Sequence, residues 1–71
     1  MDRYILKEKV KMHRNGKDKV HYIDIREKDT NVEIGSVFNG YEKDGMIDRV
    51  SRDIVMADIR AKIEQYESLV K

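Results

Sequence analysis

The sequence of 71 residues contains no cysteine and no proline. Because it lacks cysteine, neither a disulfide nor a thiolate metal site can stabilise so small a core. It has no apolar run long enough to span a bilayer, and no charged segment followed by an apolar one at its start. We therefore expect one small domain over residues 1–71, cytoplasmic and without a membrane partner, that is stabilised by packing or by self-association.

A large excess of one sign of charge is also missing, although charged residues make up 41% of the chain. The formal net charge of +1 is unevenly distributed. Residues 1–26 carry eight Lys and Arg residues against four acidic ones, whereas residues 27–71 have a net charge of −3. Domains that bind nucleic acid usually have a clearer positive excess, so the composition does not favour that class of partner.

The clearest local signal is Asn15-Gly16, in the middle of the basic segment formed by residues 9–22. This dipeptide favours a two-residue hairpin turn in which both φ angles are positive. Pairing outward from the turn sets Val10 opposite His21. The resulting register places one set of apolar side chains on a common face, as expected for a half-buried antiparallel ribbon: Tyr4, Leu6, Val10, Met12, Ile23 and Ile25.

The polar residues 28–31 predict a loop after this ribbon, and a third strand follows it. In that strand Val32, Ile34 and Phe38 alternate with polar or small residues. A four-residue loop sets Ile34 opposite Ile25, so the three apolar side chains join the same buried face. The sequence thus predicts an antiparallel meander with strands at residues 4–13, 18–26 and 31–39.

Two glycines, Gly40 and Gly45, punctuate the next segment and predict turns. A short fourth strand at residues 41–43, folded back by Asn39-Gly40, is one interpretation of this segment. The segment also partly matches an EF-hand calcium loop, but it lacks the carboxylate and the bidentate glutamate required at the first and last positions. We therefore expect no metal site here.

From about residue 48 the spacing of apolar residues changes to that of a helix, which extends to about residue 70. Asp48 or Ser51 can supply the side-chain oxygen that caps the first amides. Such a helix is about 33 Å long, comparable to a strand of about nine residues, so one helix covers one face of the sheet. The predicted fold is α+β, in the order β-β-β-α. The stripe facing the sheet consists of Val55, Met56, Ile59, Ile63, Tyr66 and Val70.

The opposite face of the predicted sheet carries residues that one helix cannot cover. Under the predicted pairing Lys7 faces Asp24 and Arg26 faces Glu33, so these four charges neutralise one another across strands. The remaining exposed lysines flank a tyrosine and two valines, close to the basic tip of the hairpin. Together these residues form the candidate surface for a protein or nucleic-acid partner: Lys9, Lys11, Arg14, Asn15, Lys17, Lys19, Val20, Tyr22 and Val37.

No group of residues indicates catalysis. His21 falls on the predicted core face between Val10 and Phe38, where a satisfied buried histidine is far more common than a catalytic one. His13 lies beside the hairpin turn, where an exposed ion pair is worth under about 1 kcal/mol. Glu8, on the same face as His21, reaches solvent if it lies near a sheet edge, and forms a perturbed pair with the histidine if both are buried. We expect a protein that is not an enzyme and has no cofactor and no metal.

Two functional hypotheses follow. In the first, an adaptor, inhibitor or regulator, of the size that phages and mobile elements carry, binds a partner protein or a second copy through the open sheet face and the basic hairpin. In the alternative, the basic hairpin enters a groove of DNA or RNA. The order of elements resembles sheet-reading DNA-binding domains of plant transcription factors and integrase arms, although none of their residue motifs occurs here. The near-neutral net charge favours a protein partner.

Overall fold

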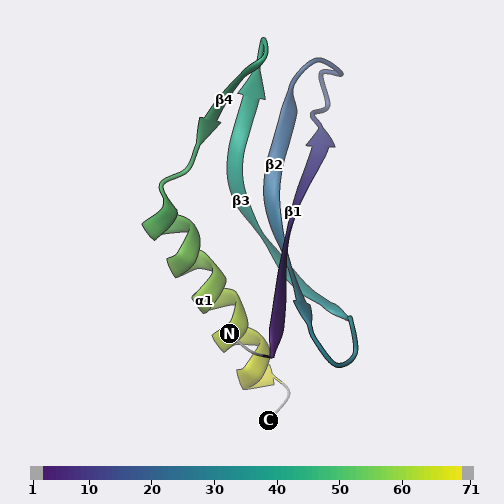
Figure 1. Ribbon diagram of the computed structural model, residues 1–71, viewed down its shortest axis with the longest axis vertical. Coiled ribbons are helices and arrows are strands. Elements are labelled where there is room, and N and C mark those ends of the chain that lie inside the picture. Colours follow the sequence, from purple (N-terminus) through teal and green to yellow (C-terminus); the bar gives the residue numbers. More distant parts are fainter. Residues whose placement is uncertain (1–2, 70–71) are drawn as a thin grey trace.

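The computed structural model describes residues 3–69, which form a four-stranded antiparallel sheet and one helix. The elements are β1 (Tyr4–Met12), β2 (Lys19–Glu27), β3 (Glu33–Lys43), β4 (Met46–Arg49) and α1 (Arg52–Leu69). Neighbouring strands in the chain are neighbours in the sheet, whose order is β1-β2-β3-β4. The sheet is curled, and α1 lies against one of its faces (Figure 1). The predicted α+β class and strand-then-helix order are confirmed, with a fourth strand present.

The first hairpin has the predicted register but a different turn. Val10 pairs with His21 along an unbroken ladder between β1 and β2. The hairpin is closed by a hydrogen bond from the His13 amide to the Asp18 carbonyl at 2.8 Å, so residues 14–17 form a four-residue loop. Gly16 has a positive φ of 73°, and Asn15 does not adopt one. The prediction of a two-residue turn is therefore wrong.

The physical reason is the side chain of Asn15, which replaces backbone pairing within the loop. Its Oδ1 accepts hydrogen bonds from the amides of Lys17 at 2.9 Å and Asp18 at 3.0 Å. An asparagine that bonds to the backbone two residues ahead forms an Asx turn, which asks for no positive φ at the asparagine itself. The loop is therefore wider than the predicted two-residue turn, while the register of the two strands is the predicted one.

Two irregularities change the phase of β3. Glu33 pairs with Arg26 as predicted, but the register shifts between Ile25 and Arg26, and again between His21 and Tyr22. Between these two β-bulges the pairing is shifted by one residue, so that Ile25 pairs with Gly35 and Tyr22 pairs with Phe38. Because side chains alternate between the faces of a strand, a shift by one residue moves each one to the other face.

The shift reverses two predictions. Val37, assigned to the open face, pairs with Ile23 and is only 3% exposed in the core. Phe38, assigned to the core opposite His21, is 51% exposed. Val32, at the end of the preceding loop, is also exposed, whereas Ile34 is half-buried and packs against the core as expected.

The fourth strand is formed by a second hairpin turn at Asp44-Gly45. Both residues have positive φ, 53° and 78°, as in the two-residue turn that favours tight hairpins. The strand therefore lies at Met46–Arg49, and not at residues 41–43 behind a turn at Asn39-Gly40. Gly40 instead lies within β3, where a Cβ atom would come within 3.0 Å of the Asp48 carbonyl oxygen. The close approach of β4 thus favours glycine at this position.

The helix begins at Arg52, later than predicted, because β4 and a short connection occupy the preceding residues. Of the two predicted caps, Ser51 is the one used: its Oγ accepts a hydrogen bond from the Ile54 amide at 3.5 Å. The stripe facing the sheet agrees with the prediction, except that Val70 lies outside the described residues. The buried core consists of Ile25, Val37, Val55, Ile59 and Ile63.

The helix covers only part of its face of the sheet. It packs on Ile25 of β2 and Val37 of β3, whereas three apolar side chains on β1 of the same face, Leu6, Val10 and Met12, are 39%, 53% and 59% exposed. Their predicted burial is wrong. A helix about 10 Å wide spans about two strands that lie about 4.8 Å apart, so one helix cannot reach all four.

The end of the helix is fastened to the start of β1, on the same side of the molecule (Figure 1). Glu67 accepts hydrogen bonds from the Tyr4 hydroxyl at 2.8 Å and the Arg3 guanidinium at 2.6 Å. The hydroxyl of Tyr66 donates a hydrogen bond to Glu27 at the end of β2. These contacts hold α1 diagonally, so the far half of β1 is left without a cover.

Candidate functional site

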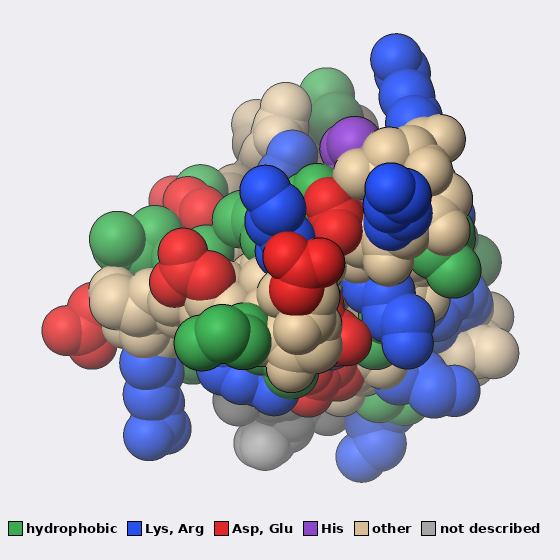
Figure 2. Space-filling model, turned by 90° about the horizontal axis from the view of Figure 1, so that it is seen from above, with side chains coloured by type: hydrophobic (Ala, Val, Ile, Leu, Met, Phe, Trp, Pro, Cys, Tyr) green, Lys and Arg blue, Asp and Glu red, His purple; other side chains and the backbone are tan. Residues whose placement is uncertain are grey.

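The basic hairpin tip is exposed as predicted. Arg14, Asn15 and Lys17 lie in the loop and are exposed, and so are Lys11 and Lys19 in the adjoining strand ends. Figure 2 looks down on the end of the molecule where the two hairpin turns lie; Lys and Arg side chains gather on the right of this view, and acidic side chains lie at its centre and left. Positive charge is therefore concentrated at the tip but bordered by acids.

A hydrogen-bond network holds the loop at this tip in place. The buried carboxylate of Asp18 accepts hydrogen bonds from the Tyr41 hydroxyl at 2.7 Å and from Asn15 Nδ2 at 2.8 Å. The His13 ring lies edge-on to Tyr41, with 5.6 Å between ring centroids. The predicted exposed ion pair of His13 is thus replaced by a contact with an aromatic ring. Tyr41 was not among the predicted site residues, because the third strand was predicted to end at residue 39, whereas β3 extends to Lys43.

The network makes stability depend on pH. The hydrogen bonds from Tyr41 and Asn15 hold the pKa of the Asp18 carboxyl below its usual range. A carboxylate with a lowered folded-state pKa stabilises the fold above its unfolded pKa of about 3.9, and the stabilisation is lost as the pH falls through the lowered value. We expect Asp18→Asn to lower Tm by a few degrees at pH 7, and the difference from the unmodified protein to shrink as the pH approaches 2.

Thermal unfolding followed by circular dichroism between pH 7 and pH 2 measures this difference. Asp29→Asn is the matched control, because Asp29 is an exposed aspartate in the other loop of the meander. Equal Tm values for Asp18→Asn and the unmodified protein at pH 7 would show that the network does not stabilise the loop.

On the face away from the helix, Phe38 lies beside Tyr22, where the sequence predicted Val37. Tyr22 is half-buried and pairs with Phe38, and the half-buried Val20 pairs with Tyr41. Val37 does not contribute, since it lies in the core. The signal that could have identified Phe38 is the pair of glycines in β3, because a glycine within a strand often marks a bulge.

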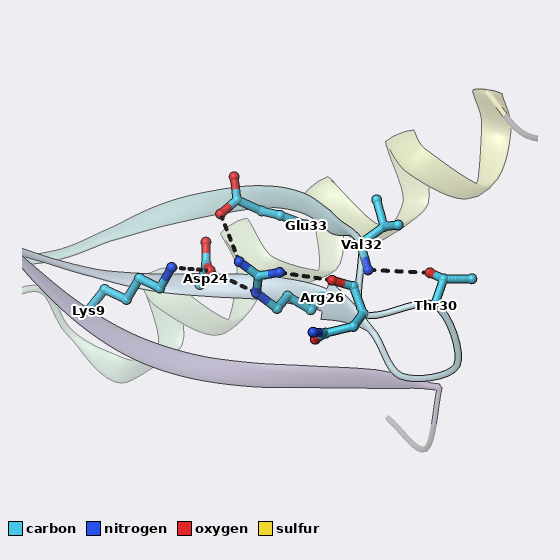
Figure 3. A network of polar contacts seen from close by, with 7 residues as sticks. Lys9, Asp24, Arg26, Thr30, Val32 and Glu33 are labelled. Carbon is cyan, nitrogen blue, oxygen red and sulfur yellow. Dashed lines mark hydrogen bonds and ion pairs between the residues drawn. The ribbon is translucent and has the colours of Figure 1, made fainter.

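Lys9, predicted to be free for a partner, is engaged within the sheet (Figure 3). Its Nζ lies 2.9 Å from Asp24, whose side chain also lies 3.2 Å from Arg26 Nε. The predicted pair of Arg26 with Glu33 is confirmed at 3.9 Å. Lys7 faces Asp24 in the register, as predicted, but the ion pair is made by Lys9. Within residues 3–69, neither Lys7 nor Lys11 forms an ion pair.

Asp24 is only 2% exposed, so its charge requires these partners. A hydrogen bond with Glu33, together with Lys9 and Arg26, lowers the pKa of Asp24 against the opposing effect of burial. The same contact with Asp24 raises the pKa of Glu33. The cluster is therefore an internal charge network, and its lysine is occupied.

A second polar cluster lies on the helix side of the sheet, beside the apolar row of β1. His21 is buried, with its Nε2 3.1 Å from Glu42 Oε1 and its Nδ1 3.8 Å from Glu8 Oε1. Glu8 is half exposed and also lies 3.3 Å from Arg49. Glu8 therefore reaches solvent at the sheet edge, as predicted for a residue of β1, and is not buried together with His21.

Neither cluster assembles a recognisable reactive group. Within residues 3–69, no three His, Asp or Glu side chains lie close enough together to hold a metal ion. The described helix is not long and apolar enough to cross a membrane. No family model, no curated protein and no solved structure matches the chain. The candidate site consists of exposed apolar and basic surface around β1 and the hairpin tip.

Proposed function

We propose that this protein is a small non-enzymatic interaction module, an adaptor, inhibitor or regulator, that binds a partner protein through the part of the sheet left open by its helix. The observation that carries the proposal is the row of Leu6, Val10 and Met12. These side chains are about half exposed, because they lie beside the core on a part of the sheet that the helix does not cover. Contiguous apolar surface exposed to water commonly marks a binding site.

The opposite face of the same strands adds a second element. The Tyr22 and Phe38 pair exposes aromatic surface, and Ile5 is also exposed there. The exposed lysines of β1 lie at its rim. An aromatic and aliphatic centre with a charged rim is the composition typical of protein interfaces. Both faces of β1 thus supply contact area, which favours a partner that approaches from the β1 side.

The proposal is tested with a variant that makes the row polar: Leu6→Ser, Val10→Ser and Met12→Ser together. The tagged unmodified protein is used to capture a partner, which is identified by mass spectrometry and whose binding is measured by titration of the purified components. We expect the variant to keep its fold and to lose binding to this partner. The matched control is Met46→Ser with Ile54→Ser, because these residues are exposed apolar side chains outside the row.

Thermal unfolding of each variant accompanies the binding titration. Equal affinity of both variants for the identified partner, or the absence of any partner whose binding depends on these faces, would contradict the proposal.

A nucleic-acid partner is the second candidate, favoured by the loop that the Asp18 network holds in place with basic side chains outward. With Lys9 engaged, four cations remain at the tip: Lys11, Arg14, Lys17 and Lys19. Four phosphate contacts give a slope of log K against log salt of about −3.6 on duplex DNA. A titration against mixed-sequence duplex and single-stranded RNA at two salt concentrations decides this candidate, and binding that Arg14→Ala with Lys17→Ala does not weaken would exclude the tip.

A further inference from the structure

The open edge of β1 is the longest unpaired strand edge of the described sheet. β1 comprises nine residues at the end of the strand order, whereas the opposite edge strand, β4, comprises four. About half of the backbone N–H and C=O groups of an edge strand point away from the sheet and are free to pair with another strand. No segment within residues 3–69 covers this edge of β1 (Figure 1).

The two faces of β1 differ sharply in chemistry along this edge. On the helix side stand Leu6, Val10 and Met12, with Glu8 between them. The charge of Glu8 is already balanced by Arg49 at 3.3 Å. On the other side, every second residue from position 7 to position 11 is a lysine, preceded by Ile5.

We infer that β1 is a docking strand, to which the partner adds an extended segment that alternates apolar and acidic residues. This inference rests on the proposed function and specifies its mode of binding. In such a segment one row of side chains continues the apolar row of β1, and the other row faces the lysines. Main-chain hydrogen bonds supply affinity, and the alternating side chains supply selectivity.

Charge decides between this partner and a second copy of the chain. If β1 paired antiparallel with β1 of another copy, the lysine face of one strand would continue the lysine face of the other, whereas a parallel pair of the same free edges would place lysines beside the apolar row. Like charges directly opposite each other destabilise a strand pair, whereas opposite charges stabilise it. The same lysines that discourage self-association therefore select an acidic strand.

The ion pair of Lys9 limits the positions at which the partner segment needs an acidic residue. Lys9 already contacts Asp24 at 2.9 Å, while Lys7 and Lys11 are exposed and make no ion pair within residues 3–69. The partner segment therefore needs acids at two positions four residues apart, with apolar residues between and beyond them on the other face. A uniformly acidic segment lacks the apolar row and does not satisfy this surface.

The probe is a nine-residue peptide that alternates valine and glutamate, blocked at both ends, compared with one that alternates valine and lysine. We expect the glutamate peptide to bind the full chain at least about tenfold more tightly, since each cross-strand pair is attractive for one peptide and repulsive for the other. Amide exchange measured by NMR should slow along β1. A glutamate peptide N-methylated at every amide should not bind, because neither of its edges keeps an N–H group with which to pair as a strand.

The decisive variant is Lys7→Glu with Lys11→Glu, which should reverse the preference between the two peptides. Lys28→Glu with Lys62→Glu is the control, since both residues are exposed outside β1, and it should leave the preference unchanged. Equal binding of the two peptides, no binding of either, or binding without slower exchange in β1 would overturn the inference. None of those results contradicts the proposed function if binding of an identified partner is still lost when the apolar row is made polar. The proposed function is contradicted only if no partner's binding depends on that row.

Discussion

Ile59→Ala should destabilise the protein by about 2–5 kcal/mol. Ile59 is 0% exposed and lies in the middle of the buried stripe of α1, against the core residues of β2 and β3. Its truncation leaves a cavity that a short helix and a curled sheet cannot close. In a domain of this size each 1 kcal/mol lowers Tm by about 4–8 °C, so a fall of at least about 8 °C is expected in thermal unfolding.

The control is Ile54→Ala in the first turn of the same helix. Ile54 is 55% exposed, so the same change of residue there removes little buried surface and should shift Tm by only a few degrees. Similar Tm values for the two variants would show that α1 does not present the face containing Ile59 to the sheet.

Val37→Asp should unfold the protein, whereas Phe38→Asp should leave it folded. Val37 is 3% exposed in the core, where an unpaired carboxylate costs at least about 3 kcal/mol, a large share of the stability of a small domain. Phe38 is its neighbour in the chain but is 51% exposed on the other face, so we expect a cost of about 1 kcal/mol or less. Circular dichroism at 25 °C separates the two results.

This pair of substitutions also tests the two β-bulges. A strand without them, as the alternation of residues alone predicts, would bury Phe38 and expose Val37, so the two variants would exchange their behaviour. Val37→Ala and Phe38→Ala form a milder pair for the case in which the aspartate variant cannot be purified, and the order of their Tm values should be the same.

The first hairpin could be predicted well because its register depends on short-range pairing alone. The predicted pairs from Met12 with Lys19 to Leu6 with Ile25 all occur, and the ladder between β1 and β2 contains no bulge. The form of the turn could not be predicted, because Asn15 can either adopt a positive φ in a two-residue turn or accept backbone hydrogen bonds with its side chain. In the structure its side chain accepts these hydrogen bonds. The tight two-residue geometry occurs instead at Asp44-Gly45, an equally typical dipeptide for it.

The third strand was predicted less well because bulges are decided by tertiary packing. A single extra residue between the pairs at Arg26 and Ile25 reverses the faces of β3 up to Phe38, where the second bulge restores them. Gly35 faces Lys62 of the helix, and Gly40 allows β4 to approach, but the sequence alone does not say which of these glycines accompanies a bulge. The part of the sheet that the helix covers depends on the width of the helix and the spacing of the strands, and the periodicity of the sequence does not determine it.

The candidate site follows the same division. The exposed loop with Arg14 and Lys17 could be predicted from the turn, since charged residues at a hairpin tip remain in solvent. The occupation of Lys9 could not, because Asp24 is its diagonal neighbour rather than its direct partner. The exposed row on β1 was missed for a physical reason: those residues have the apolar pattern of a core and lie on the core face, but beyond the helix.

Deuterium uptake of residues 4–12 in the presence of the identified partner tests the proposed function most directly. These residues form β1, whose edge and apolar row are open in the free protein. We expect their uptake to fall when the partner is bound, while uptake in the hairpin loop at residues 14–17 stays unchanged. Slower exchange confined to the loop or to α1, with β1 as exposed as before, would contradict the role assigned to this strand.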